Sequence, residues 1–391
     1  MRNHMWRCSF HALRALCMIF LFFVPSWGSD WEVSPYVAVR GEYNDNILFD
    51  PDQEKLDDMV TRVRPRVEGR YGTERLDFSL DLGLEWEKYL DYTELDTVDH
   101  DHYIALSYAL SRTLSLNTGA YFRKDTTLEA ELLETGLLVS NREDRRRFGG
   151  DLGFVYDVSH RLSCSGEWSR GYGDYPDDPD RRNDYQEDAF GLAPRYVLSP
   201  ATTLFLNMAY TETVYDKEGI ARTVITNYNI IPSLRHDFAE DFYVSGGVGY
   251  SYSEQKTEDE ENGGVAFDLR IHGDWKKGSI ELLANRYQYS TYYRRSADRS
   301  RLTLRGTYRL SHRFSSSLSV SYYINRFSGY NDNDNEYFTV YPYFSYIFTP
   351  SVRLRGAVGY SKYEYEDRSD RDRLIATLEI RFGWPRLLSG H

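Results

Sequence analysis

Alternation of apolar and polar residues with a period of two constrains this chain more than any other feature. The clearest stretch runs from Leu76 to Glu87, where leucine, phenylalanine and tryptophan alternate with aspartate, serine, glycine and glutamate. Successive side chains of a β-strand point to opposite faces of the sheet. A strand with one wholly apolar face and one acidic face fits a wall between lipid and water. The same period recurs along most of the chain and is clear again at residues 374–382.

Two kinds of connection take turns between the predicted strands. The short ones are Gly72–Arg75, Ser111–Thr113, Val158–Arg161, Ser199–Thr202, Asp237–Asp241, Lys276–Gly278, Ser311–Arg313 and Thr349–Ser351. The longer, polar ones include Asn44–Asp58, Leu90–Asp99, Asp125–Asp144, Gly173–Arg182 and Glu254–Asn262. Short periplasmic turns and longer extracellular loops are typical of outer-membrane barrels.

The number of turns predicts the size of the barrel. Eight short turns, with both chain ends on their side, imply a transmembrane antiparallel up-and-down β-barrel of about eighteen strands, with sixteen as the alternative. A soluble β-helix or propeller would instead have to bury one whole face of the alternating strands. The fold class is therefore all-β.

Aromatic residues recur at one depth of the predicted wall. One stands on the apolar face just before most of the short turns: Tyr71, Tyr108, Tyr156, Tyr196, Trp275, Tyr308 and Tyr346. Tyrosine and tryptophan concentrate at membrane–water interfaces, where their rings sit at headgroup level. The chain holds 34 tyrosines and 20 phenylalanines, a surplus that such a girdle would use. We therefore predict an aromatic girdle at this end of the barrel.

The first segment of the chain reads as a secretion signal. Three arginines flank or precede an apolar run at residues 15–24, and Ser26 and Gly28 follow at the small-residue positions of a cleavage site. The run is shorter than the roughly 20 residues that a transmembrane helix needs. We predict a signal peptide at residues 1–28, a barrel at residues 29–391, and location in the outer membrane of a Gram-negative bacterium.

Charge and motif content exclude several classes of function. Loss of the three arginines and no acids takes the formal charge from −13 to −16, which argues against a nucleic-acid partner. Cys164 is the only cysteine outside the predicted signal, so no intrachain disulfide forms in the remainder. The sequence has no HExxH or CxxC spacing. We predict no enzyme activity, no catalytic residues, no metal site and no cofactor.

The polar faces of the predicted strands carry arginines beside carboxylates. The predicted lumen-lining residues are Arg62, Arg64, Arg66, Asp77, Asp81, Glu85, Arg301, Arg305, Arg309, Arg353, Arg355, Glu379 and Arg381. On one interpretation, arginine–carboxylate ladders only stiffen the wall. On the other, an arginine-lined pore attracts anionic solutes or polyanionic chains. The sequence leaves both open.

Two segments depart from the regular pattern. Arg286 would face lipid if the alternation continued through Ala284–Tyr289, so we expect a bulge or an early strand end there. The longest loop, Asp125–Asp144, contains several leucines. It could fold inward as a constriction, form an exposed lid, or form a short helix. No residues are left over for a separate plug domain.

The first hairpin contains three short sequence segments that can be compared with known families. The chain reads Val-Ser-Pro-Tyr at 33–36, Glu-Tyr-Asn-Asp-Asn-Ile-Leu-Phe at 42–49 and Val-Arg-Pro-Arg-Val at 63–67. It resembles the putative β-barrel porin 2 type of outer-membrane protein, whose first hairpin often carries a Tyr-Asp-Asp-Asn-like motif and a later proline. Asn44 departs from the acidic form of that motif. The resemblance implies an outer-membrane barrel and an association with exopolysaccharide or capsule systems. The arginine-lined barrel is also similar in outline to the alginate-export porins.

These features lead to a ranked set of functions. We favour a passive conduit that exports an anionic or polar exopolysaccharide. The alternatives are a nutrient or general diffusion porin for small solutes, and a non-conducting structural or adhesive barrel. The expected partners are outer-membrane lipid and lipopolysaccharide, the barrel-assembly machinery and periplasmic polysaccharide-export components.

Overall fold

The computed structural model describes residues 30–138, 142–176, 184–216, 222–256, 260–291, 294–327, 334–365, 369–384 and 388–390. The predicted signal peptide lies outside these residues. The first nine strands are β1 Asp30–Asn44, β2 Asp58–Gly72, β3 Leu76–Tyr89, β4 Thr97–Ala109, β5 Leu114–Thr126, β6 Asp144–Asp157, β7 Leu162–Asp174, β8 Tyr185–Ser199 and β9 Thr202–Tyr215. The others are β10 Thr223–Ala239, β11 Phe242–Gln255, β12 Glu260–Trp275, β13 Gly278–Ser290, β14 Ser296–Arg309, β15 Phe314–Phe327, β16 Asn335–Thr349, β17 Val352–Tyr365, β18 Arg371–Gly383 and β19 Leu388–Gly390. A 3₁₀ turn, η1 (Thr93–Leu95), and one helix, α2 (Thr127–Thr135), complete the described elements.

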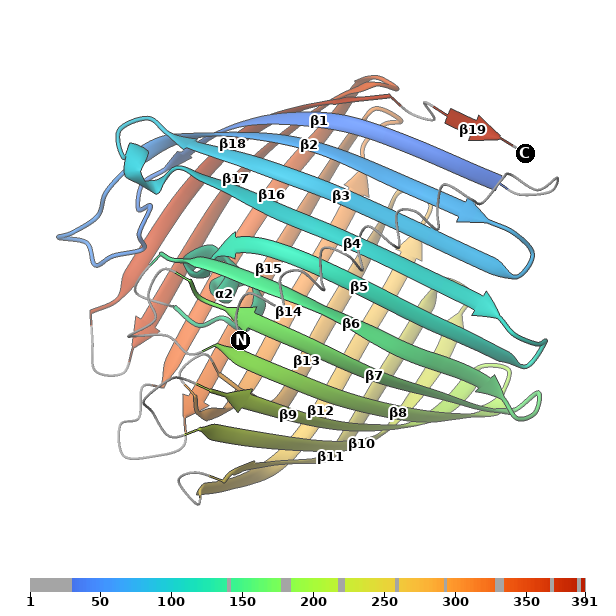
Figure 1. Cartoon of the computed structure of the whole chain (residues 1–391). Coiled ribbons are helices and arrows are strands. Elements are labelled where there is room, and N and C mark those ends of the chain that lie inside the picture. Colours follow the sequence, from blue (N-terminus) through green and yellow to red (C-terminus); the bar gives the residue numbers. More distant parts are fainter. Residues whose placement is uncertain are drawn as a thin grey trace, which may run out of the picture.

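The strands form a closed antiparallel barrel (Figure 1). Each of β1 to β17 pairs with the next strand, and β1 pairs with β18 from Tyr36 opposite Gly383 to Asn44 opposite Ile375. Closure leaves no free sheet edge around most of the ring; the exception is the stretch at residues 260–266 of β12, which pairs with β11 but not with β13. Within the described residues the ring has eighteen strands, which confirms the larger of the two predicted counts. The short β19 continues the wall beside the start of β1.

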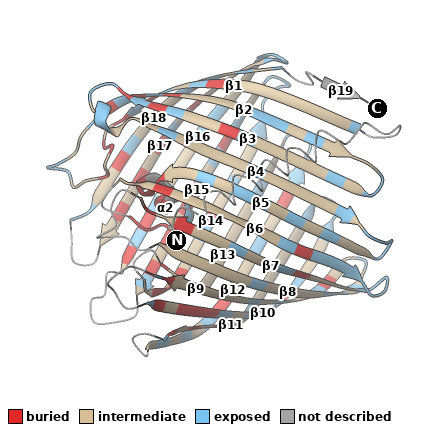
Figure 2. Cartoon of the chain, in the orientation of Figure 1, coloured by how far each residue is buried: buried red, intermediate tan, exposed pale blue. Residues whose placement is uncertain are grey.

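The barrel has an apolar outer face rather than a conventional core. Large apolar side chains on the outside remain exposed in the isolated chain, among them Leu152 at 55%, Val248 at 65% and Leu378 at 54%. Figure 2 shows that buried residues gather mainly toward the long-loop side, around α2, and that most of the wall is only partly buried. No helix in the described part of the chain is long and apolar enough to cross a membrane.

Hydroxyl side chains shape four of the short turns. Ser111 Oγ accepts hydrogen bonds from the backbone N–H groups of Thr113 and Leu114. Thr73, Ser159 and Ser311 make the same pair of contacts in their own turns. Such local bonds satisfy turn N–H groups that have no ladder partner. All eight predicted short turns lie between strands of the barrel.

Four prolines interrupt the ladder on one side of their strands. Register pairing to the next strand is missing at Pro65, Pro194, Pro232 and Pro342. Proline has no N–H to donate to the ladder. Three of these strands, β8, β10 and β16, also shift register a few residues further on, close to their short turns. The prolines therefore mark irregular places in the wall without opening the ring.

Only part of the irregularity expected at Ala284–Tyr289 is present: there is no bulge, but the pairing of β13 with β12 ends at Arg286. β13 pairs with β14 without a register shift from Gly278 to Ser290. Arg286 shares the outward face and binds the Asp298 carboxylate on β14, with Nη2–Oδ2 at 2.7 Å. The ion pair lies toward the long-loop end of the strand, where a charged residue needs no lipid contact.

Candidate functional site: the inner wall and its inward-folded loops

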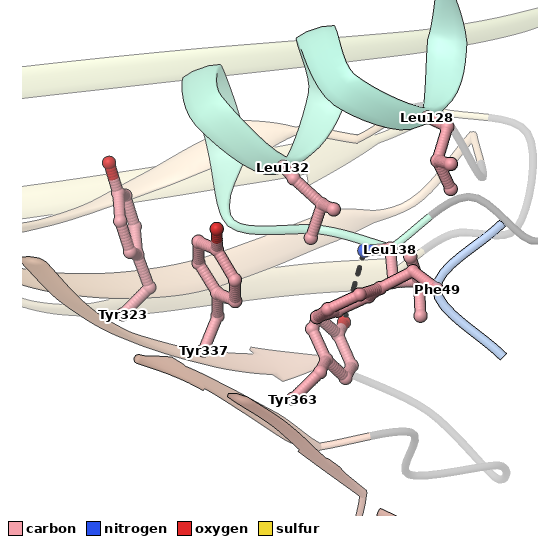
Figure 3. Packing of buried hydrophobic residues seen from close by; sticks show 7 residues of the cluster. All are labelled: Phe49, Leu128, Leu132, Leu138, Tyr323, Tyr337 and Tyr363. Atoms are coloured by element: carbon pink, nitrogen blue, oxygen red, sulfur yellow. Dashed lines mark hydrogen bonds between the residues drawn. The ribbon is translucent and has the colours of Figure 1, made fainter. Parts of the chain in front are cut away.

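The loop between β5 and β6 folds into the barrel. Its helix α2 ends at Gly136, which adopts a left-handed conformation with φ of 70°. Figure 3 shows two leucines of α2 against Tyr323, Tyr337 and Tyr363, which come from β15, β16 and β17. In a ring of eighteen strands, β6 and β15 lie opposite each other. The loop therefore crosses the lumen. Of the three possibilities that the sequence left open for this loop, two occur together: it folds inward as a constriction, and it contains a short helix.

An apolar cluster fixes this crossing. Leu128, Leu132 and Leu138 are at most 1% exposed, and Phe49 from the loop after β1 is fully buried beside them. Full burial of such a side chain contributes about 1.5–3 kcal/mol. The backbone N–H of Leu138 also donates a hydrogen bond to Tyr363 Oη at 3.3 Å. Packing thus holds the loop against the far wall.

Charged groups anchor the near end of α2. Arg145, 1% exposed on β6, binds Asp125 on β5 with Nε–Oδ1 at 2.8 Å and also binds Glu131 of α2. Arg147 binds Glu134 at 2.7 Å. Burial raises the pKa of the Glu131 carboxyl, while the nearby Arg145 acts in the opposite direction. A buried guanidinium with several carboxylate partners holds the helix in one orientation.

The far end of the crossing is held by hydrogen bonds to backbone oxygens. Arg299 on β14 donates to Glu134 O at 3.2 Å, and Asn325 on β15 donates to Gly136 O at 3.3 Å. These side chains satisfy carbonyl groups that the end of a helix leaves without intrahelical partners.

The loop after β1 also folds inward, and it contains the family-type motif. Asn46 is fully buried, and its Nδ2 donates to Asp50 O and Asp372 O, both at 2.8 Å. Phe49 adopts a positive φ of 56°, and the Arg373 guanidinium lies 4.9 Å from its ring. The motif residues therefore shape a loop that packs against the inner wall.

The arginines on β2 are paired with carboxylates. Arg62 binds Glu42 and Glu87, each at 3.0 Å. The neighbouring Arg64 contacts Glu85 at 3.4 Å and Glu379, and Arg66 contacts Asp101 at 3.1 Å and Asp81. The carboxylates predicted to lie beside these arginines do so, except Asp77, which lies near Gly72 at the short-turn end of β3. On β2 the geometry matches the stiffening interpretation.

A second group of arginines shares the inner face but is much less neutralised. Arg301 is the register partner of Tyr323, so Arg305 and Arg309 lie on the same inner face of β14. We use the name arginine wall for five residues toward the short-turn end: Arg305, Arg309, Arg353, Arg355 and Arg381. Within the described residues, neither Arg309 nor Arg353 has a carboxylate within 4.0 Å.

The carboxylate contacts of the other wall arginines are long. Arg305 lies 3.7 Å from Glu281, Arg355 3.7 Å from Glu379, and Arg381 3.9 Å from Glu68. Arg353 and Arg381 are direct register partners. Like charges directly opposite each other on a sheet are destabilising. A positive surface is thus retained here at some cost to stability.

Strands β15 and β16 separate the arginine-wall residues on β14 from those on β17 and β18, and they add hydroxyl groups to the inner face. The inner face carries Ser315, Ser317 and Ser319 on β15 and Tyr343 on β16, which is 38% exposed. Nearby, a cavity of about 310 Å³ is bounded on the inner wall by residues that include Tyr36, Arg64, Glu85, Asp101, Arg355 and Arg381. Its volume is at the lower end of the range of small-ligand pockets, about 300–1,000 Å³.

The predicted girdle residues lie on the outer face beside the short turns. Tyr108 is 38% exposed and Trp275 47%. Tyr108 pairs with Leu76 and Leu116, which continue the apolar outer surface. Their contact with a membrane interface stays a prediction.

Sequence reasoning missed the tyrosines that receive α2 and the buried Arg145. Tyr323, Tyr337 and Tyr363 each stand on the polar face of an alternating strand, where a small polar residue is ordinary. Three tyrosines at one level of neighbouring strands are a signal for something packed against them. No local pattern points to Arg145, because its partners lie on α2.

Comparisons with known proteins agree with this architecture. OccK2 (OpdF) of Pseudomonas aeruginosa has 11% identity and a TM-score of 0.50, with 90% of this chain and 98% of that chain covered. The FrpB iron transporter of Neisseria meningitidis has 12% identity and a TM-score of 0.50, with 85% of this chain and 62% of that chain covered. OpdK of P. aeruginosa has 12% identity and a TM-score of 0.49, with 90% and 99% covered. Identities this low show the fold alone.

The sequence comparisons differ in outcome. The comparison with curated proteins gives no match. The family model for the putative β-barrel porin 2 matches residues 28–223, which is half of the chain. The matched residues include the first hairpin, whose short sequence segments gave the resemblance described above. The chain therefore belongs to the putative β-barrel porin 2 family of outer-membrane barrels.

Proposed function

We propose that this barrel is a passive outer-membrane conduit for the export of an anionic or polar exopolysaccharide. The arginine wall carries the proposal, because its positive charge is incompletely matched by carboxylates of the chain. Guanidinium groups bind carboxylates and sulfate- or phosphate-like groups through charge-assisted hydrogen bonds. An acidic polymer would supply the missing negative charge.

The rest of this surface suits a sugar chain as well. Serine hydroxyls on β15 can donate and accept hydrogen bonds from sugar hydroxyls. Tyr343 offers both an exposed ring and a hydroxyl group. Contacts of this kind, each weak and partly solvated, allow a polymer to bind and move on, as conduction requires.

A diffusion porin for small solutes is the second candidate. The inward crossing of α2 favours it, because a fixed constriction admits small solutes more readily than a polymer. The two candidates differ in what must happen at the constriction. An export conduit requires the inward loops to move or to leave a path beside them, whereas a diffusion porin does not.

The proposal brings further expectations with it. We expect residues 1–28 to be removed as a signal peptide, and the barrel to contact outer-membrane lipid, lipopolysaccharide and the barrel-assembly machinery. Periplasmic polysaccharide-export components would supply the polymer and the driving force.

The experiment compares single-channel currents of the purified protein in planar bilayers with an acidic oligosaccharide added. The test variant is Arg353→Gln/Arg355→Gln/Arg381→Gln. The matched control is Arg112→Gln/Arg161→Gln/Arg313→Gln, which removes the same charge from exposed short turns. Loss of about 0.5–1 kcal/mol per arginine predicts block weakened by roughly tenfold or more in the test variant. Equal block in all three proteins would remove the arginine wall from the proposal.

A further inference from the structure

Strands β12 and β13 separate toward the long-loop end of the barrel. β13 pairs with β14 along its whole length, but it pairs with β12 only as far as Arg286 opposite Phe267. Beyond that point, residues 260–266 of β12 pair with β11 alone. The ring thus has a seam on this side, although it is closed nearer the short turns.

The end of the β13–β14 hairpin lies inside the barrel instead of in its wall. We call residues 287–291 and 294–296 the hairpin tip. Gln288 N–H donates to Ser251 Oγ on β11 at 2.9 Å, and Asn227 Nδ2 on β10 donates to Ser290 Oγ at 2.9 Å. Further across, Tyr215 Oη on β9 donates to Thr291 O at 2.7 Å. The tip therefore crosses the inner faces of three strands and reaches a fourth.

The packing beneath the tip leaves buried polar groups without partners. Gln255 is 2% exposed, and neither its Nε2 nor its Oε1 has a hydrogen-bond partner. The buried Ser253 Oγ and Asn227 Oδ1 are also without one. A buried polar group without a partner is destabilising, and the separated strands also forgo ladder hydrogen bonds.

The existing register offers the tip a second position. Continuation of the Phe267–Arg286 ladder would pair Val265 with Gln288 and Gly263 with Ser290. Residues 263–266 of β12 have no ladder partner on the side of β13, so this edge is available to the tip. Tyr287 and Tyr289 would keep their inward orientation, because the alternation of the strand is unchanged.

We propose that the hairpin tip is a gate for the lumen. In the closed position it lies across the inner faces of β9–β12, next to the α2 crossing, since Arg299 contacts both Tyr287 and the Glu134 carbonyl. In the open position it pairs with residues 263–266 of β12, completes the wall and withdraws from the lumen. The gate operates whichever solute the barrel carries.

Cysteine cross-linking tests the two positions, in a background with all three native cysteines replaced by serine. Val265→Cys/Gln288→Cys forms a disulfide only if the tip reaches the open position. Asn227→Cys/Ser290→Cys, joined by a short bifunctional thiol reagent, holds the tip in the closed position. The control Leu269→Cys/Ala284→Cys joins residues that are already register partners on the same two strands. Slower mobility after heating on a denaturing gel verifies that each variant is folded.

Single-channel current through the cross-linked proteins tests whether the position of the tip controls conduction. We expect the 265–288 disulfide to raise single-channel conductance at least about twofold, and reduction to reverse the increase. The 227–290 cross-link should hold the current at or below that of the uncross-linked protein, and the control disulfide should leave the current unchanged. The gate is refuted if the folded 265–288 variant never cross-links while the control does, or if it cross-links without a change in current. Loss of oligosaccharide block with gating intact would instead count only against the proposed cargo.

Discussion

The α2 crossing makes a sharp prediction about the conductance of the barrel. Leu128 and Leu132 are 1% and 0% exposed in the cluster that holds α2 against the far wall. A buried leucine-to-alanine change costs about 2–5 kcal/mol, since it loses the transfer energy and leaves a cavity. The barrel strands gain nothing from these two side chains except the contact with α2. Leu128→Ala/Leu132→Ala should therefore weaken the docking of α2 while the barrel remains folded.

The size of the effect follows from that loss. Even about 2 kcal/mol changes the ratio of docked to undocked loops by roughly thirtyfold. We expect larger single-channel currents with frequent transitions between conductance levels, recorded in planar bilayers. The control is Leu110→Ala, a leucine 52% exposed near a short turn. Wild-type conductance and noise in a folded double variant would refute the claim that this cluster sets the constriction.

The remaining predictions concern the polar contacts of the same loops. Arg145→Ala leaves buried Glu131 and partly buried Asp125 without their nearest cation, and should cost about 3–5 kcal/mol, measured as a lower temperature for loss of heat-modifiable gel mobility; Arg112→Ala is the control. Because burial raises the pKa of Glu131 above its ordinary 4.5, the docked loop binds this proton more tightly than the undocked loop. The stabilisation of the docked loop by this group is therefore fully present at acidic pH and is lost as pH rises through the raised pKa. Conductance of the wild type should fall on acidification. In Glu131→Gln this pH-dependent fall should be absent. Asn46→Ala removes three hydrogen bonds with backbone groups, worth about 0.5–1.5 kcal/mol each, and should speed hydrogen exchange or proteolysis in the loop after β1, whereas exposed Asn117→Ala should not. Unchanged exchange in Asn46→Ala would contradict the role given to the family-type motif.

The wall of this barrel could be predicted from the sequence because its determinants are local. Alternation places each side chain on one of two faces, and the hydroxyl-containing turns join neighbours in the chain. The strand at Leu76–Tyr89 and all eight short turns follow from such patterns. Arg286 shows where local patterns stop being informative. Its partner Asp298 lies on the next strand at a distance that only the register determines.

The interior could not be predicted in the same way, because it depends on contacts across the lumen. Nothing near α2 in the sequence indicates that it packs against β15–β17. The arginines show the same limit. Arg62 and Arg353 stand in similar alternating patterns, yet one is surrounded by carboxylates and the other faces Arg381. Only the arrangement of neighbouring strands separates an arginine that stiffens the wall from one available to a solute.

The most direct test of the central claim is the reversal potential of the purified wild-type protein under a salt gradient, with and without an acidic oligosaccharide. The account predicts an anion-selective current that the oligosaccharide reduces from the short-turn side, where the arginine wall lies. A cation-selective current, or an anion current that the oligosaccharide leaves unchanged, would contradict the proposed conduit. A folded barrel that passes no current even with the 265–288 disulfide formed would contradict it as well.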